Sequence, residues 1–215
     1  MPSSALSKFE TNILVDVHRL IESHGQLNHQ GAGRRGLGHI TRSGVLMLCA
    51  AWELYLEELL IESARIIVAR AASPADLPKK VQKEIAKAVR ESKHELKPLD
   101  LAGEGWRDVY INHATARVQG LNTPKSANVD TLFLRLVGVP VLSQSWSHGA
   151  GTIDDFVSAR GDIAHRGRDA QYVIIGSLIA YKDQIVRTVI DSDNALADFL
   201  RDNTQGRAPW QRRAV

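Results

Sequence analysis

Three residues near the end of one expected helix have side chains suited to chemistry: Arg160, Asp162 and His165. An imidazole, whose pKa lies near 6.5, can transfer protons close to neutral pH. A guanidinium can stabilise negative charge that develops on phosphoryl oxygens. The segment Asp155–Gly167 therefore predicts proton transfer beside an anionic group, and a basic loop that holds Arg166 and Arg168 follows it.

The spacing of these residues sets limits on what one helix can do. Asp162 and His165 lie three residues apart, so they share a face and can form a hydrogen bond that fixes the histidine tautomer. Arg160 lies five positions before His165, which is about 140° around a helix with 3.6 residues per turn. One helix therefore aims both groups at one point only through an irregular last turn or a second copy of the chain.

The elements that must position these residues are all helical. Apolar residues recur at three- and four-residue steps, which predicts helices over about 4–23, 40–71, 79–95, 107–118, 128–137, 152–167 and 170–202. Strand-like alternation is not evident. The pattern predicts an all-α helical bundle built on the long helices 40–71 and 170–202. We expect one domain over residues 1–215, in which 1–38 form an N-terminal helix and a glycine-rich loop and 204–215 form a short basic tail.

Composition and charge favour a globular chain with an anionic partner. Of the 215 residues, 44% are apolar and 24% charged, as in soluble domains. The formal net charge is only +3, but 18 of the 27 basic residues are arginine, the better phosphate ligand. The first residues lack the pattern of a signal peptide, and acidic residues interrupt the apolar run 44–61. We therefore expect a cytoplasmic protein without a membrane span.

Two other signals fail on mechanism. The run Gly31–Gly36 matches the letters of a dinucleotide fingerprint, but an expected helix precedes it where a strand is required. The eight histidines include no one-turn pair with an intervening glutamate, and a single cysteine, Cys49, cannot form a cysteine cluster. The sequence thus predicts neither a cofactor nor a metal site.

The chain resembles the HEPN superfamily, in the branch often encoded beside RiboL-PSP-type RNA-processing proteins. The features that carry the resemblance are Arg160 and His165, separated by four residues before the final long helix, and the upstream run Ala51–Leu56. The resemblance covers about residues 40–200. The resemblance implies a helical homodimer and a metal-independent ribonuclease of a toxin–antitoxin or antiphage defence system, with RNA and an antitoxin or defence protein as partners.

The same resemblance implies roles for individual residues. Arg160 and His165 become the catalytic pair, and Asp162 supports them. The RNA backbone is held by four arginines: Arg166, Arg168, Arg34 and Arg35. Gly161 stands where the family usually has a polar residue, commonly asparagine, and Asp162 one place later can compensate. The alternative is a non-catalytic HEPN-like scaffold or RNA-binding partner.

The spacing between arginine and histidine does not by itself identify the site. An arginine followed by four to six residues and a histidine arises about twice by chance in such a chain. It occurs four times, at Arg19–His24, Arg34–His39, Arg107–His113 and Arg160–His165. Arg107–His113 is the real competitor, because Asp108 follows the arginine as in family motifs.

Arg160 and His165 also suit an ordinary helix C-terminus, where cations are favoured. For Trp52 and Glu53 we favour a core tryptophan beside a carboxylate satisfied by an arginine.

Overall fold

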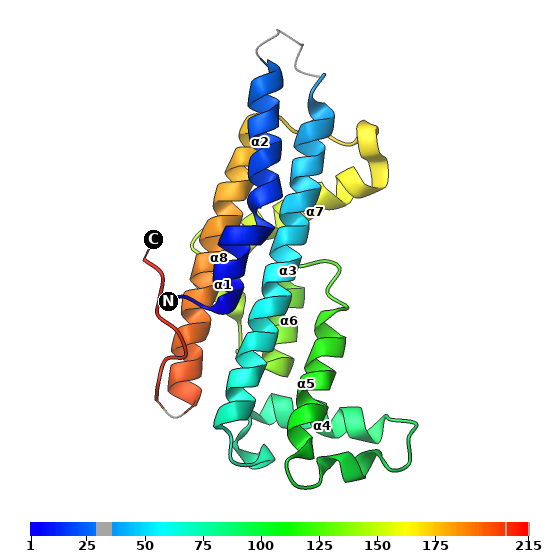
Figure 1. Ribbon diagram of the computed structural model, residues 1–215. Coiled ribbons are helices and arrows are strands. Elements are labelled where there is room, and N and C mark those ends of the chain that lie inside the picture. The colour runs from blue at the N-terminus through cyan, green and yellow to red at the C-terminus, as the bar shows by residue number, and fades with distance from the viewer. Residues whose placement is uncertain (29–35, 205, 215) are drawn as a thin grey trace.

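The protein is all-α. A computed structural model describes residues 1–28, 36–204 and 206–214 (Figure 1), and over these ranges it has no strand, which confirms the predicted fold class. The elements are α1 Ser4–Lys8, η1 Phe9–Ile13, α2 Val15–Leu27, α3 Gly38–Arg70, η3 Pro74–Asp76, α4 Lys79–Arg90, η4 Lys97–Leu101, α5 Gly105–Val118, α6 Ser126–Leu136, η5 Leu142–Ser145, α7 Ala150–Arg166, η6 Gly167–Asp169 and α8 Ile175–Asn203. Arg34 and Arg35 lie outside the described residues.

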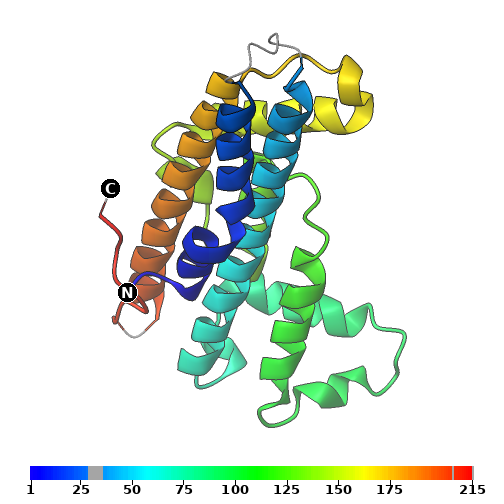
Figure 2. The same cartoon turned by 45° about the horizontal axis from the view of Figure 1, so that its top comes forward.

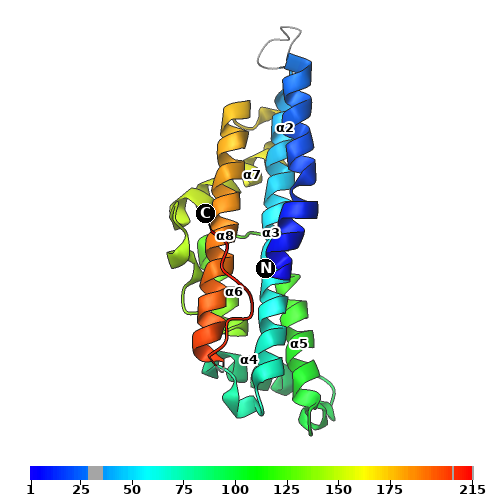
Figure 3. The ribbon, with the colours of Figure 1, turned by 60° about the vertical axis from the view of Figure 1, so that its left-hand side comes forward.

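The long helix α3 is the axis of the molecule. It packs against α1, α2, α5, α6, α7 and α8. Helices α2, α3 and α8 lie side by side, and α3 and α8 run in the same direction (Figures 1 and 3). Helices α4, α5 and α6 gather around the C-terminal half of α3 (Figure 2). The predicted apolar character of the first half of α3 is explained by this central position, because most of its faces meet another helix.

An aromatic cluster of Trp52, Tyr55 and Trp146 lies at the centre of the core. Trp52 is fully buried, stacks on Tyr55 with ring centroids 5.9 Å apart, and meets Trp146 edge-on at 5.7 Å. Its indole N–H donates to the carbonyl of Pro124 at 3.2 Å. Because Pro124 lies in the α5–α6 loop, this bond ties that loop to α3.

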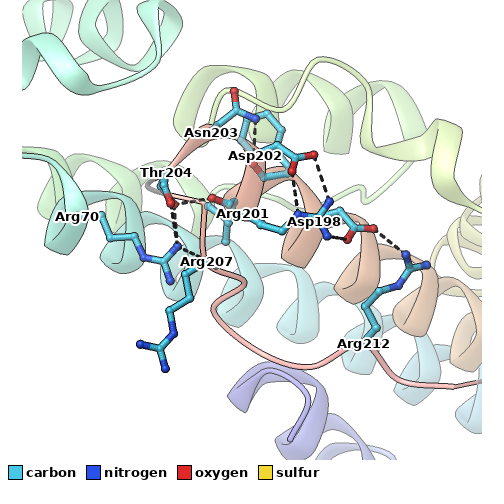
Figure 4. A network of polar contacts seen from close by, with 10 residues as sticks. Arg70, Asp198, Arg201, Asp202, Asn203, Thr204, Arg207 and Arg212 are labelled. Atoms are coloured by element: carbon cyan, nitrogen blue, oxygen red, sulfur yellow. Dashed lines mark hydrogen bonds and ion pairs between the residues drawn. The ribbon is translucent and has the colours of Figure 1, made fainter.

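The C-terminal segment returns along α8 and is held to it by a buried tryptophan and an ion pair. The indole N–H of Trp210 donates to the carbonyl of Asp193 at 3.1 Å. Arg212 contacts Asp198, which also binds Arg201, each at 2.9 Å (Figure 4). The amide of Gln211 donates to the carbonyl of Met1 at 2.9 Å. The basic segment expected after residue 204 is therefore anchored to the bundle at Trp210, Gln211 and Arg212, while most of its described side chains stay exposed.

Asp193 makes the stability of this junction depend on pH. Its side chain is fully buried, accepts a hydrogen bond from Ser3 and has one oxygen, Oδ2, without a partner among the described residues. Burial raises the pKa of Asp193 to about 6. Folding is therefore favoured when Asp193 is protonated. This contribution to the free energy of unfolding is complete below the pKa of Asp193 in the unfolded chain, near 4, and is lost as pH rises through 6.

We expect Asp193→Asn to stabilise the protein above pH 7 by about 2–3 kcal/mol, because a shift of one pKa unit is worth about 1.4 kcal/mol. The gain should vanish near pH 4, where the wild-type carboxyl is protonated. Urea unfolding at a series of pH values measures the difference. Asp183→Asn, at an exposed position of the same helix, is the control. An equal effect of Asp193→Asn at pH 4 and pH 8 would contradict the assignment.

Candidate functional site

Helix α7 presents two different faces. Its buried residues are Ile153, Phe156, Val157 and Ile163, and Arg160 falls in the middle of the same stripe on a helix of 3.6 residues per turn. This stripe packs against α3, α6 and α8. The C-terminal end of α7 and η6 project from the bundle beside α3 before the chain returns to α8 (Figure 1). Arg160 is thus directed into the protein and the last turn of α7 away from it.

Arg160 is held by three groups from two segments. Its Nε donates to the sulfur of Cys49 at 3.2 Å, and its Nη2 donates to Glu53 and to the carbonyl of Asn122, the latter at 3.1 Å. Cys49 and Glu53 lie one turn apart on α3, and Asn122 lies in the α5–α6 loop. The remaining nitrogen, Nη1, has no hydrogen-bond partner among the described residues, and the side chain is 23% exposed. The guanidinium is therefore fixed in orientation with one amino group still available.

The electrostatics of this cluster follow from partial burial. Burial raises the pKa of Glu53, and the charge and hydrogen bond of Arg160 oppose that effect. Burial also raises the pKa of the Cys49 thiol, so the sulfur stays protonated near neutral pH. Removing Arg160 would leave the Glu53 carboxylate half-buried without its cation. The interpretation of Trp52 as a core residue and of Glu53 as a carboxylate satisfied by an arginine is confirmed.

His165 lies exposed in the last turn of α7. Gly167, with φ of 56°, ends the helix in a backbone conformation that favours glycine. Asp162 shares its face of the helix, but its carboxylate accepts from the amide of Gln171 at 3.0 Å and pairs with Arg166 at 3.1 Å. The predicted bond between Asp162 and His165 is not among the hydrogen bonds of the described residues.

The structure does not bring Arg160 and His165 to one point within a single chain. The angular mismatch expected from the sequence persists, because α7 stays regular helix through Arg166. Three exposed side chains lie close together in the chain at the end of α7 and in η6: His165, Arg166 and Arg168. We call them the basic surface, in which Arg166 is ion-paired with Asp162. The candidate site of one chain is therefore two half-sites: a fixed guanidinium against α3 and an exposed imidazole among arginines.

The competing pair, Arg107 and His113, has structural roles. Arg107 donates to the carbonyls of Val68 and Ala71, the latter at 2.9 Å, at the C-terminal end of α3. These carbonyls lack partners within the helix, so Arg107 acts as a cap.

His113 belongs to a separate network. Its Nε2 lies 3.4 Å from Glu84, which Arg135 binds through two nitrogens at 2.7 and 2.9 Å. Burial lowers the pKa of His113. Arg107 and His113 therefore serve different packing contacts, one at the end of α3 and one between α4, α5 and α6.

Sequence reasoning missed Cys49 and Asn122 as partners of Arg160. The available signal was the four-residue spacing of Cys49 and Glu53, which places both on one face of the helix. Asn122 offered no signal, because its contribution is a backbone carbonyl. Within residues 1–28, 36–204 and 206–214, no helix is long and apolar enough to cross a membrane.

Comparison with known proteins identifies a family. A family model described as RiboL-PSP-HEPN matches residues 12–198, a range that contains α2 to α7, most of α8 and both half-sites. No curated protein and no solved structure matches the chain.

Proposed function

The chain belongs to the RiboL-PSP-HEPN family, and from this premise we propose that it is a metal-independent endoribonuclease that works as a homodimer, in a toxin or antiphage defence role. Two observations support the proposal best: His165 is exposed, and Arg160 is fixed by Glu53 with one amino group that has no partner among the described residues. The direct test is incubation of the protein with labelled RNA in excess EDTA.

The proposed reaction uses the 2′-hydroxyl of the RNA as an internal nucleophile. The bond between O2′ and phosphorus forms as the bond between phosphorus and O5′ breaks, and the proton lost from O2′ is balanced by one delivered to O5′. His165 suits both proton transfers. The open Nη1 of Arg160 suits the negative charge that grows on the phosphoryl oxygens. Arg166 and Arg168, with Arg34 and Arg35, would hold the RNA backbone.

A homodimer resolves the separation of the half-sites. A two-fold axis near the end of α7 would place Arg160 of one protomer opposite the imidazole of its partner. Helix α3 offers an apolar contact surface for a second copy, because Leu46, Met47 and Leu54 are 38–40% exposed. Apolar residues grouped on an exposed helix face are common at interfaces between copies of a chain.

Mixing two inactive variants tests this arrangement. We expect Arg160→Ala and His165→Ala to be inactive alone, and a refolded one-to-one mixture to regain up to about a quarter of wild-type cleavage, since half of the dimers would carry one intact composite site. Initial rates on labelled RNA measure the recovery, and each variant refolded alone is the control. A dimeric mixture that stays inactive would show that both groups of a site come from one chain, or that both sites are needed.

A non-catalytic scaffold is the second candidate, and one observation favours it. Arg160 is neutralised by Glu53, and Gly161 occupies the position next to it. An arginine used only for packing would be paired in this way. The scaffold proposal gains support if neither wild-type protein nor any variant cleaves RNA while the dimer forms and binds RNA.

A further inference from the structure

A pocket of about 320 Å³ lies between α4, α6 and the α5–α6 loop, next to Arg160 and its hydrogen-bond partners. Asn122 connects the two. It lines the pocket, and its carbonyl accepts the hydrogen bond from Nη2 of Arg160 at 3.1 Å. The pocket lies at the lower end of the size range of small-molecule sites. A ligand within it would therefore be one residue away from the proposed catalytic arginine.

The pocket has an apolar floor and polar side chains around it. Leu121 and Leu136 are buried and Leu132 is half-buried, and these three side chains make the floor apolar. Asn122, Asn128 and Thr131 stand around it. The amide nitrogen of Asn128 donates to the carbonyl of Thr123 at 2.8 Å, which fixes the loop. The side-chain oxygen of Asn128 and the side-chain amide of Asn122 have no hydrogen-bond partners among the described residues.

The charge of the pocket is positive. Arg135 is neutralised by Glu84 through two hydrogen bonds. Arg117 lines the pocket, is exposed and forms no ion pair with any described residue. One uncompensated guanidinium thus stands at the rim, and a guanidinium can bind two phosphate oxygens at once.

We propose that this pocket binds one nucleotide, with the base on the leucine floor and the phosphate at Arg117. A base presents apolar faces and an edge of alternating donors and acceptors, which amide side chains can read. The inference rests on the proposed function in that the nucleotide belongs to the RNA substrate, where it would set the base preference of cleavage. A free mononucleotide has the same chemistry and is the other source of the ligand.

The test compares pocket variants with a matched control in the full-length protein. The pocket variants are Arg117→Gln, which removes the cation, and Thr131→Trp, which fills the space from an exposed position of α6. Arg19→Gln changes an exposed arginine on α2 and is the control. The probes are the four nucleoside monophosphates and a short single-stranded RNA, the latter with His165→Ala in the background to prevent cleavage. Calorimetry measures binding and circular dichroism checks folding.

We expect both pocket variants to weaken binding about tenfold or more, as loss of a charge-assisted contact does, and the control to bind as the parent protein. Weakening of RNA binding alone identifies the nucleotide as part of the RNA chain. Weakening of monophosphate binding, with or without RNA, identifies a site that also accepts the free ligand. Unchanged binding of both probes in two folded variants overturns the proposal.

The outcome separates this inference from the ribonuclease proposal. If the wild-type protein cleaves no RNA but binds monophosphates through Arg117, the nuclease fails and the pocket stands. If cleavage occurs and the pocket variants retain wild-type binding and base preference, the nuclease stands and the pocket fails.

Discussion

Replacing His165 by alanine lowers RNA cleavage by at least about 100-fold, the usual worth of a positioned acid or base, and leaves the folded protein unchanged. His165 is exposed in the last turn of α7, so its removal opens no cavity and breaks no hydrogen bond among the described residues. Cleavage of labelled RNA measures the loss, and the thermal unfolding midpoint verifies that the fold is intact.

His113→Ala is the matched control, because His113 also follows an arginine at a family-like spacing. We expect it to retain wild-type cleavage at temperatures where it is folded, and to lose about 1 kcal/mol of stability because Glu84 loses one of its partners. The two histidine variants should therefore separate activity from stability. A silent His165→Ala together with an inactive, folded His113→Ala would move the site to Arg107 and His113.

Arg160→Ala should lower both the RNA cleavage activity and the stability of the protein. It removes the open amino group that faces the substrate in the proposal, and it strips Glu53 of its cation. The double variant with Glu53→Gln should regain stability, since a neutral amide is less costly to leave half-buried than a carboxylate, but it should stay inactive. This pattern distinguishes a catalytic guanidinium from a purely structural one.

A substrate with 2′-deoxyribose at the cut site is not cleaved at all, while the all-ribose substrate is cleaved in excess EDTA. The deoxy substitution removes the nucleophile but leaves every phosphate, so the modified strand should still bind the basic surface around Arg166 and Arg168 and compete with RNA. The product of the ribose substrate should end in a 2′,3′-cyclic phosphate. Gel electrophoresis with end-labelled strands, and treatment that opens the cyclic phosphate, measure both expectations.

Salt and chelator supply the controls for this substrate experiment. Binding of both strands should weaken as salt rises, because phosphate contacts release counterions. Loss of cleavage in EDTA, or equal cleavage of the deoxy strand, would contradict the proposed mechanism. Absence of cleavage with either strand would favour the scaffold and direct attention to Gly161.

The sequence predicted the helices well because their apolar spacing is strong. The helix ending near residue 167 was expected from 152, and α7 begins two residues earlier, at Ala150, after Gly149 with φ of 77°. The sequence also predicted the divergence of Arg160 and His165, which follows from helix geometry alone. The long final helix starts at Ile175 instead of 170, because the chain must first turn back from the end of η6.

The partners of Arg160 could not be predicted in the same way. Cys49, Glu53 and Asn122 lie more than 35 residues away in sequence, and their meeting depends on how α7 crosses α3. Helix crossing is set by the packing of many side chains and has no local signature. The role of Arg107 as a cap for α3 was hidden for the same reason, since its partners are backbone carbonyls.

The junction between Met1 and Gln211 makes the chain nearly a closed ring. Two hydrogen bonds of 2.9 Å join these residues, one from the terminal amine and one from the amide of Gln211. A short peptide linker could therefore join Gln211 to Met1, and new ends could be opened in an exposed turn such as 92–95, which yields a circular permutant of residues 1–211. The first described residues and the C-terminal segment that meets them lie across the bundle from the end of α7 (Figure 1). Affinity tags or fluorescent labels at either end would thus leave the proposed dimer surface accessible.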